Sequence, residues 1–256
     1  MEALPPSVWP HMRSWLEPER PGPLVGSHLL HTSIGRWWVD RWPDPRTSLM
    51  LAGGNLAVRG DVGVLGCDTL RAFVQALLVD WDRILVDVAP GAEEEMARAL
   101  GAPQTWERVF HSRPRAAVAA RPARAGLRRI EANDANALLA LDPDLHWISD
   151  TYDGPAGLAR TATAWGWWVD GRLVAVAAPF FVGSTYEDIG VVTEPEHRGR
   201  GGSAACAAAL AADVERRGRV PSWTTSPDNE ASLRVADKLG FRQCGEGVLL
   251  VAGKPM

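Results

Sequence analysis

The feature that most constrains the fold of this chain is a glycine-rich turn at residues 198–203, with the sequence Arg-Gly-Arg-Gly-Gly-Ser. A strand-like run at 189–193 precedes the turn, and a helix-like, alanine-rich run follows it at 204–217. Backbone N–H groups point outward at a helix N-terminus, where the helix dipole also favours an anion. Glycine lets a ligand approach the backbone because it has no Cβ atom. The turn therefore predicts a bound pyrophosphate.

Composition excludes several classes of protein. The 256 residues are enough for one large or two small domains, and 46% of them are hydrophobic. A net charge of −4 argues against a nucleic-acid partner. The three cysteines are widely spaced, which predicts a reduced, cytoplasmic protein with neither a disulfide framework nor a metal site. No apolar run approaches the roughly 20 residues of a membrane span, so we expect no membrane partner.

A composition shift divides the chain into two domains. Residues 113–126 are rich in Ala, Arg and Pro and lack periodicity. We therefore predict a first domain at 1–118, a linker at 119–126 and a second domain at 127–256. The most basic stretch of the chain lies here, and it forms either a solvated surface or a contact with a cofactor phosphate or an acidic partner. Its arginines are Arg113, Arg115, Arg121, Arg124, Arg128 and Arg129.

The second half predicts an α/β fold with a mixed sheet. We expect strands at 127–130, 162–169, 172–181, 186–193 and 220–225, and a strand pair at 241–251. We expect helices at 132–141, 155–161, 204–217 and 229–239, with a polar-aromatic loop at 146–151. Asp170-Gly171 between two apolar runs is typical of a β-hairpin. Strands dominate early and then alternate with helices, which indicates a mixed sheet covered by helices.

The first half repeats this order in a weaker form. A helix is expected at 8–17, a hairpin around Gly53-Gly54, and a helix capped by Asp68. A strand at 83–89, a helix at 92–100 and a strand at 105–111 follow. The repetition suggests a degenerate internal duplication. The first half lacks the glycine-rich turn, so we expect no second cofactor there. We expect the first half to form either a wall of the active site or a homodimer surface.

Two motifs identify a family resemblance. Arg198, Gly201 and Ser203 occupy the defined places of the pattern Arg/Gln-x-x-Gly-x-Gly/Ala, where Ser203 departs from the last position but is small. Residues 229–241 follow the pattern Asn-x-x-Ala/Ser…Lys-x-Gly-Phe. Together they resemble the acyl-CoA-binding region of the GNAT superfamily of N-acyltransferases. The resemblance implies a GNAT fold for 127–256. More weakly, residues 35–40 and 42–46 are similar to the degenerate, smaller first domain of some two-domain bacterial GNAT proteins.

The resemblance implies acetyl-CoA, or coenzyme A, as cofactor. The backbone amides of the turn are then expected to hold the pyrophosphate, and the pantetheine arm to lie along a strand that splays from its neighbour. An N–H group near Val191 is expected to meet the thioester oxygen. The cofactor-binding residues so implied are Val191, Val192, Thr193, Arg198, Gly199, Arg200, Gly201, Gly202, Ser203, Asn229 and Ser232.

The acceptor implied by the family is an amine, which needs a base to remove its proton. Glu187 is the first candidate, because some family members place a glutamate at a matching position. Asp188 is adjacent but points to the opposite face of the strand, and His146 and Asp150 lie in the loop expected to border the acceptor. The family's tyrosine before Lys-x-Gly-Phe is missing. Either another group protonates the thiolate or it leaves unassisted, since a thiol pKa is about 8.5.

Aromatic residues give the last set of candidates. The candidates for an acceptor pocket are Trp147, Asp150, Tyr152 and Trp167. The aromatic residues among them could instead pack in the core. The leading hypothesis is acetyl transfer to the primary amine of a small molecule in a ternary complex. Acetylation of a protein or peptide, and a catalytically silent acyl-CoA-binding module, are the alternatives.

Overall fold

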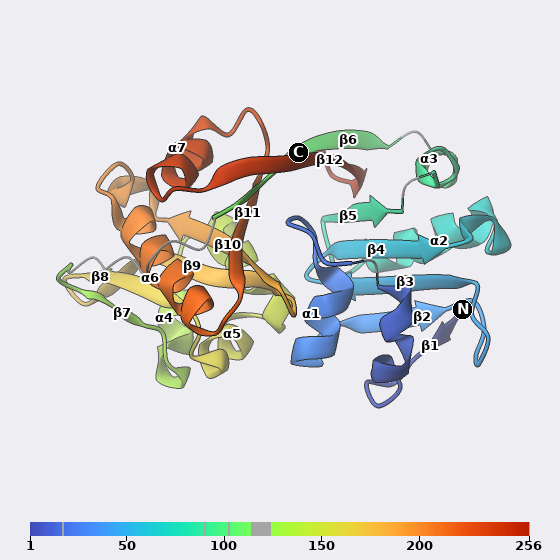
Figure 1. Cartoon of the computed structure of the whole chain (residues 1–256), viewed down its shortest axis with the longest axis horizontal. Helices are drawn as coiled ribbons and strands as arrows, with labels where there is room; N and C mark the ends of the chain where they lie inside the picture. Colours follow the sequence, from blue (N-terminus) through green and yellow to red (C-terminus); the bar gives the residue numbers. More distant parts are fainter. Residues whose placement is uncertain (17, 90, 102, 114–123, 256) are drawn as a thin grey trace. The chain divides into compact units, whose positions relative to one another are not determined.

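The computed structural model describes residues 1–16, 18–89, 91–101, 103–113 and 124–255 (Figure 1). Most of the predicted linker lies outside these ranges. The chain forms two compact units. Unit 1 comprises Met1–Pro18, Val25–Arg108 and Glu246–Met256, and unit 2 comprises Glu19–Leu24 and Val109–Gly245. These bounds differ from the predicted domains, because each unit takes a short segment from the other half of the chain.

Unit 1 is built on a mixed sheet with strand order β1-β2-β3-β4-β5-β12. The strands are β1 (Glu2–Ala3), β2 (Arg36–Val39), β3 (Thr47–Ala52), β4 (Asn55–Gly60), β5 (Arg83–Val88) and β12 (Arg242–Gly253). The helices are η1 (Trp9–Trp15), α1 (Val25–Thr32), η2 (Val62–Val64), α2 (Cys67–Leu77) and α3 (Glu93–Leu100), where η denotes a 3₁₀-helix. The hairpin predicted at Gly53-Gly54 joins β3 to β4.

The start of α2 corrects one prediction. Its N-cap residue is Gly66, which has a φ of +71° and gives no side-chain cap. Asp68 lies one residue inside the helix and pairs with Arg71 at 3.2 Å. Leu70, Val74 and Leu77 of α2 are buried in the core of unit 1.

The strands of unit 2 have the order β6-β11-β10-β9-β8-β7, with both parallel and antiparallel pairs. The strands are β6 (Gln104–Ser112), β7 (Leu127–Arg129), β8 (Trp165–Val169), β9 (Arg172–Val182), β10 (Tyr186–Thr193) and β11 (Val220–Thr225). The helices are η3 (Ala132–Asp134), α4 (Ala135–Leu139), η4 (Pro143–Tyr152), α5 (Pro155–Thr161), η5 (Pro195–His197), α6 (Gly202–Arg216) and α7 (Glu230–Lys238).

Two elements predicted for the second half of the chain take another form. Residues 146–151 were expected to form a loop but belong to η4. The strand pair expected at 241–251 is the single long strand β12, whose end, Leu250–Gly253, pairs with β5 of unit 1. By contrast, β10, β11 and α5 have the predicted bounds.

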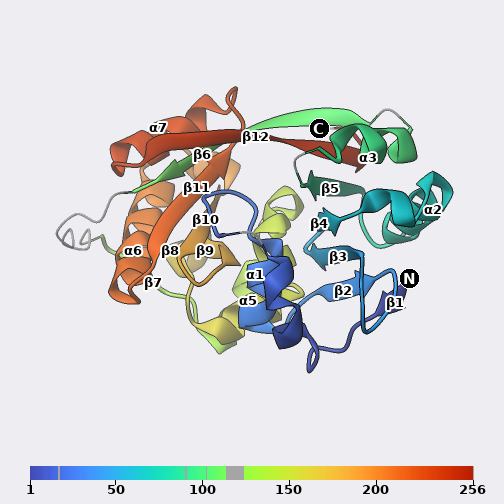
Figure 2. The same cartoon turned by 45° about the vertical axis from the view of Figure 1, so that its right-hand side comes forward.

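Helix α6 packs on strands β8 to β11 (Figure 2). Its buried face is made largely of small residues, including Ala207, Ala211 and Val214, all fully buried. Small side chains let a helix lie close to a sheet. The closest approach is at Gly202, where an added Cβ atom would come within 2.3 Å of the Trp167 ring.

No helix in the ranges given above is long and apolar enough to cross a bilayer. Those residues also hold no group of three or more His, Cys, Asp or Glu side chains that could bind a metal ion.

Candidate active site

The sheet of unit 2 opens between β10 and β11. The two strands pair in parallel only from Tyr186–Asp188 to Val220–Ser222. Although β10 continues to Thr193, no further pairing with β11 occurs among these residues, all of which the structure describes. On its other edge β10 stays paired with β9 as far as Thr193. The edge of β10 from Ile189 onward therefore lacks a strand partner.

Asp188 lies where the parallel pairing ends. Its side chain is buried, and one carboxylate oxygen accepts hydrogen bonds from Ser222 Oγ at 3.0 Å and Thr224 Oγ1 at 2.9 Å. The register of β9 against β10 also shifts between Asp188 and Ile189. Asp188 thus ties the two strands together at the point from which they diverge.

The glycine-rich turn follows β10 and η5. Gly199 and Gly201 have φ values of +73° and +77°, in the left-handed region that favours glycine. Gly201 is the N-cap of α6, makes no side-chain cap, and is followed by no acidic residue in the first turn. The first amide groups of this 15-residue helix therefore have no side-chain acceptor. Two buried polar atoms nearby, Thr193 Oγ1 and His197 Nδ1, also lack a hydrogen-bond partner.

These features fit an anionic cofactor. Arg198 and Arg200 are exposed on the turn, and Arg198 Nε donates a long hydrogen bond of 3.4 Å to the Thr193 carbonyl at the end of β10. The open edge of β10 thus leads directly to an uncapped, positively charged helix N-terminus. This arrangement suits a ligand with an extended amide-containing arm and a phosphate group.

Asn229 and Ser232, the predicted cofactor residues of α7, have partners within the protein. Asn229 is the N-cap, and its side chain accepts from the Ser232 backbone N–H at 3.1 Å. Ser232 Oγ accepts from Trp223 Nε1 of β11 at 2.9 Å. The Ser232 hydroxyl still has its own hydrogen to donate.

Glu187, the first candidate for the base, is enclosed by arginines. Its side chain is 1% exposed, and its carboxylate accepts from Arg217 at 3.0 and 2.5 Å and from Arg219 at 2.7 Å. Both oxygens are thus engaged by guanidinium groups, and reaching an amine would require breaking a buried ion-pair cluster. These contacts favour a structural role that fixes the start of β10 to the segment after α6.

The segment η4 packs on β9 and β10. Thr151 Oγ1 donates to the Phe180 carbonyl at 2.7 Å, and Tyr152 OH donates to the Pro179 carbonyl at 2.6 Å. These carbonyls belong to β9 where its register shifts. Burial raises the pKa of Tyr152. Tyr152 is thus an anchor of η4 inside the protein, not a residue exposed to an acceptor.

Trp147, Ile148 and Phe180 surround Gly190 of β10, since a Cβ atom there would approach each of them within 3.3 Å. Trp147 is 41% exposed and meets Phe180 edge to face at 5.6 Å. The Trp147 ring therefore offers an accessible apolar surface beside the open strand. Trp167 lies elsewhere, against Gly202 at the start of α6.

Asp150 is the carboxyl group of η4 whose pKa is raised. Burial raises its pKa to about 6, and the charge of His146 opposes this shift. His146 itself donates through Nε2 to the Leu141 carbonyl at 3.0 Å. A carboxyl group with a pKa near 6 is ionised at neutral pH but more basic than an ordinary aspartate, which suits a general base.

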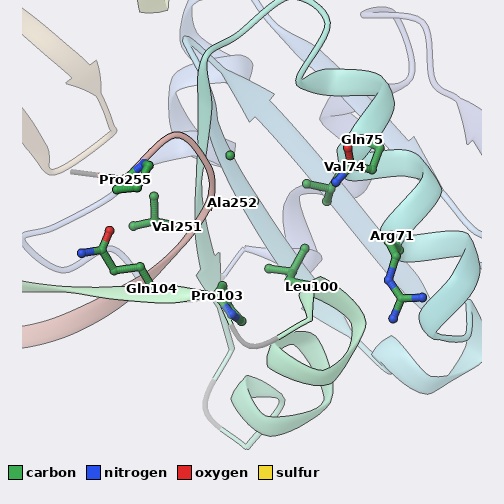
Figure 3. Close-up of a pocket in the computed structure, with 10 residues that line it drawn as sticks. Arg71, Val74, Gln75, Leu100, Pro103, Gln104, Val251, Ala252 and Pro255 are labelled. Atoms are coloured by element: carbon green, nitrogen blue, oxygen red, sulfur yellow. The ribbon is translucent and has the colours of Figure 1, made fainter.

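A cavity of about 270 Å³ lies in unit 1 (Figure 3) and contains none of the predicted site residues. It is lined by α2, by the segment after α3 and by the end of β12. Arg71 is the charged side chain among its described lining residues, and it binds the Ala99 carbonyl at 3.0 Å and Asp68. These contacts leave the cavity without a set of converging reactive groups.

The sequence alone did not reveal the partners of Glu187 or of the arginines in the basic stretch. Nothing in the pattern connected Arg217 and Arg219 to Glu187, 30 and 32 residues earlier. The basic stretch at 113–129 is evident in the sequence, and most of its described arginines bind carboxylates in the structure. Arg113 pairs with Glu215, Arg128 with Asp134, and Arg129 with Asp213.

Comparison with known proteins identifies the family of this chain. The family model for GNAT acetyltransferases matches residues 23–247. A protein of Streptomyces virginiae named "Uncharacterized N-acetyltransferase in mutA 5'region" is 34% identical over 222 residues, which are 85% of this chain and 90% of the relative.

Solved structures share the fold. A GCN5-related N-acetyltransferase-like protein from Streptococcus suis superimposes with a TM-score of 0.65 at 19% identity, over 88% of this chain and 90% of that one. A tandem GNAT protein from the clavulanic acid biosynthesis pathway gives a TM-score of 0.59 at 16% identity, over 98% of this chain and 96% of its own.

The fold and the family match define an acyltransferase of the GNAT type. The chain belongs to the GNAT acetyltransferase family, and the predicted resemblance is confirmed. It is accordingly an N-acetyltransferase of the GNAT type.

Proposed function

We propose that this protein transfers an acetyl group from acetyl-CoA to a primary amine of a small molecule. The observation that carries the proposal is the open edge of β10, which leads to the uncapped glycine turn of α6. A ligand with a phosphate at one end and an amide-rich arm matches both parts. Acetyl-CoA is such a ligand, and when bound it supplies an activated acyl group as a thioester.

The residues of this chain divide the binding task. The backbone amides of Arg198–Ser203 hold the pyrophosphate, and Val191, Val192 and Thr193 present backbone groups to the arm. Asn229 and Ser232 border the arm at the start of α7. An N–H group near Val191 stabilises negative charge on the carbonyl oxygen, a donor of a kind worth about 3 kcal/mol in other enzymes.

The base that we propose is Asp150, in place of Glu187. Asp150 combines partial burial, a pKa of about 6 and a location in η4, which packs over β10. The cationic form of His146 favours the ionised form of Asp150, so His146 tunes the base. Asp188 and Glu187 instead have engaged carboxylates that fix β10.

The acceptor amine lies against Trp147 in this proposal, so that Asp150 removes its proton as nitrogen attacks. Holding both reactants together supplies much of the rate enhancement. The thiolate leaves unassisted, because a thiol pKa of about 8.5 makes it a fair leaving group. The exposed face of Trp147 favours amines with an apolar part.

The test has two stages. Thermal unfolding is first measured with acetyl-CoA and longer acyl-CoAs, where a ligand at 100 times its Kd adds about 2.7 kcal/mol of stability. Thiol release is then followed with a panel of small amines and, separately, lysine-containing peptides. Stabilisation by acetyl-CoA with turnover of a small amine supports the proposal. No stabilisation by any acyl-CoA contradicts the cofactor, and turnover of peptides alone contradicts the acceptor class.

A further inference from the structure

Arg124 occupies an unusual position at the glycine turn. It lies just before β7, far from the family motif in the sequence, yet its Nη2 donates to the Arg200 carbonyl at 2.9 Å. A Cβ atom at Gly201 would lie 3.6 Å from its Nη1. The guanidinium group is therefore beside the N-cap of α6.

Trp167 holds the guanidinium in this place. The Arg124 guanidinium carbon lies 3.9 Å from the Trp167 ring centroid, a cation–π contact. Trp167 is itself fixed, because it packs on Gly202 and its Nε1 donates to the Ala125 carbonyl at 3.2 Å. The side chain of Arg124 is thus preorganised by a buried ring.

The charges around this position are unbalanced. Arg124 binds the backbone of the turn that carries Arg198 and Arg200, and this turn leads into a helix N-terminus that itself has positive partial charge. Each of the other described arginines of the basic stretch binds a carboxylate, whereas Arg124 has no carboxylate partner among the described residues. Its Nε atom is also buried without a hydrogen-bond partner. An anion at the turn would balance the charge of Arg124 and satisfy this donor.

We propose that Arg124 binds the phosphate groups of coenzyme A as a residue outside the GNAT motif. This inference rests on the proposed function. In this proposal the planar guanidinium, held over the Trp167 ring, shares an anion with the amides of α6, and a fork of this kind suits phosphate oxygens. The role assigned to Trp167 is then to position Arg124, which differs from a role in acceptor binding.

The experiment compares Arg124→Gln with Arg128→Gln. Arg128 is a matched control, because it makes the same kind of contact with the neighbouring Trp168, at 3.6 Å, but pairs with Asp134. Binding of CoA is measured by calorimetry at low and high salt. Loss of one charge-assisted contact predicts about 10-fold weaker binding for Arg124→Gln, with a smaller salt dependence. Arg128→Gln is expected to bind CoA like the wild type.

Two further ligands separate a phosphate contact from a structural effect. With S-acetylpantetheine, which has no phosphate, Arg124→Gln should have the wild-type kcat/KM. With dephospho-CoA, the defect persists if Arg124 binds the pyrophosphate and disappears if it binds the 3′-phosphate. The Arg124→Lys variant keeps the charge and should recover part of the affinity. The melting temperature without ligand should not fall in Arg124→Gln.

Three results would overturn the inference. Wild-type affinity for CoA in Arg124→Gln removes it while leaving the proposed function intact. Equal losses with Arg128→Gln, or with S-acetylpantetheine, assign Arg124 a structural role. No CoA binding by the wild-type protein removes both the inference and the proposed function.

Discussion

Units 1 and 2 both contain a pair of parallel strands, and they differ in how far these strands remain together. In unit 1, β4 pairs with β5 over Asn55–Val58, and a further hydrogen bond joins Ala89 N–H to the Val58 carbonyl at 3.3 Å. In unit 2, the pairing of β10 with β11 ends at Asp188. The backbone groups that could hold an extended ligand are thus consumed in unit 1 and available in unit 2.

A side-chain clamp reinforces the closed strands of unit 1. Arg59 binds the carboxylate of Asp87 at 2.5 Å and the carbonyls of Val58 and Asp87 at 2.9 and 3.1 Å. Unit 2 has Asp188 in place of such a clamp, bound to hydroxyl groups of β11. The clamp joins the far end of the strand pair, whereas Asp188 joins only its beginning.

The helices that follow these strands show that a glycine N-cap alone does not make an anion-binding site. Gly66 of α2 and Gly201 of α6 are both N-caps with positive φ and no side-chain cap. The first turn of α2 contains Asp68, and that of α6 contains no acid. An anion is therefore favoured at α6, where the adjacent strands are also open.

The largest expected effect comes from a residue of η4, which packs on β9 and β10 as α1 packs on β3 and β4 in unit 1. Asp150→Asn in η4 should lower kcat by at least 10²-fold, the usual share of a general base. The wild-type rate should rise with pH through about 6 and then level off. Steady-state kinetics from pH 5 to 8 check this. The control is Asp153→Asn, an exposed residue of left-handed conformation that asparagine tolerates.

The stability of the protein tests the environment of Asp150 independently of the kinetics. The pKa of Asp150 is raised in the folded state, so its negative charge destabilises the fold as the pH rises from about 4 to 6. After a discount for partial exposure, Asp150→Asn should be more stable than the wild type by about 1 kcal/mol at pH 7, with no difference below pH 4. Denaturant unfolding at both pH values would show whether the sign is wrong.

The second prediction compares the two N-cap glycines directly. Gly201→Ala adds a Cβ atom at the proposed phosphate site and should weaken acetyl-CoA binding about 100-fold. Gly66→Ala, at the equivalent place in unit 1, should lower stability by about 1 kcal/mol and leave binding unchanged. Calorimetric titration measures both. Equal affinity in the two variants would mean that the difference between the units has another source.

The third prediction separates the two roles considered for Glu187. Glu187→Gln leaves the guanidinium groups of Arg217 and Arg219 partly buried without a counter-charge, which should cost about 2 kcal/mol of stability. The kcat of the folded fraction should remain close to the wild-type value. Unfolding curves and kinetics on the same sample test it. A large loss of kcat with unchanged stability would restore Glu187 as the base.

The smallest expected effect is on the clamp of unit 1. Arg59→Met leaves the carboxylate of Asp87 with fewer partners and should lower stability by about 1.5 kcal/mol. Titration should still give one acetyl-CoA per chain, as in the wild type, because Asp68 in the first turn of α2 disfavours an anion there. A second bound molecule would show that the clamp alone closes the site of unit 1.

Local signals in the sequence determined the parts of this protein that depend on neighbouring residues. The glycine turn, the strands at 186–193 and 220–225, and the helix starting after Asn229 each follow from short-range patterns of size, polarity and backbone freedom. The two GNAT motifs lie in these parts, which is why the family could be identified from the sequence.

Tertiary structure alone decided which of these parts meet. Arg124 lies 76 residues from the Arg200 carbonyl that it binds, and Arg217 is 30 residues from Glu187. The residues at which two strands part, and the strand with which β12 pairs, depend on packing between distant segments. Hydrophobic period and helix capping report only contacts within a few residues, so they carry no information about these partners.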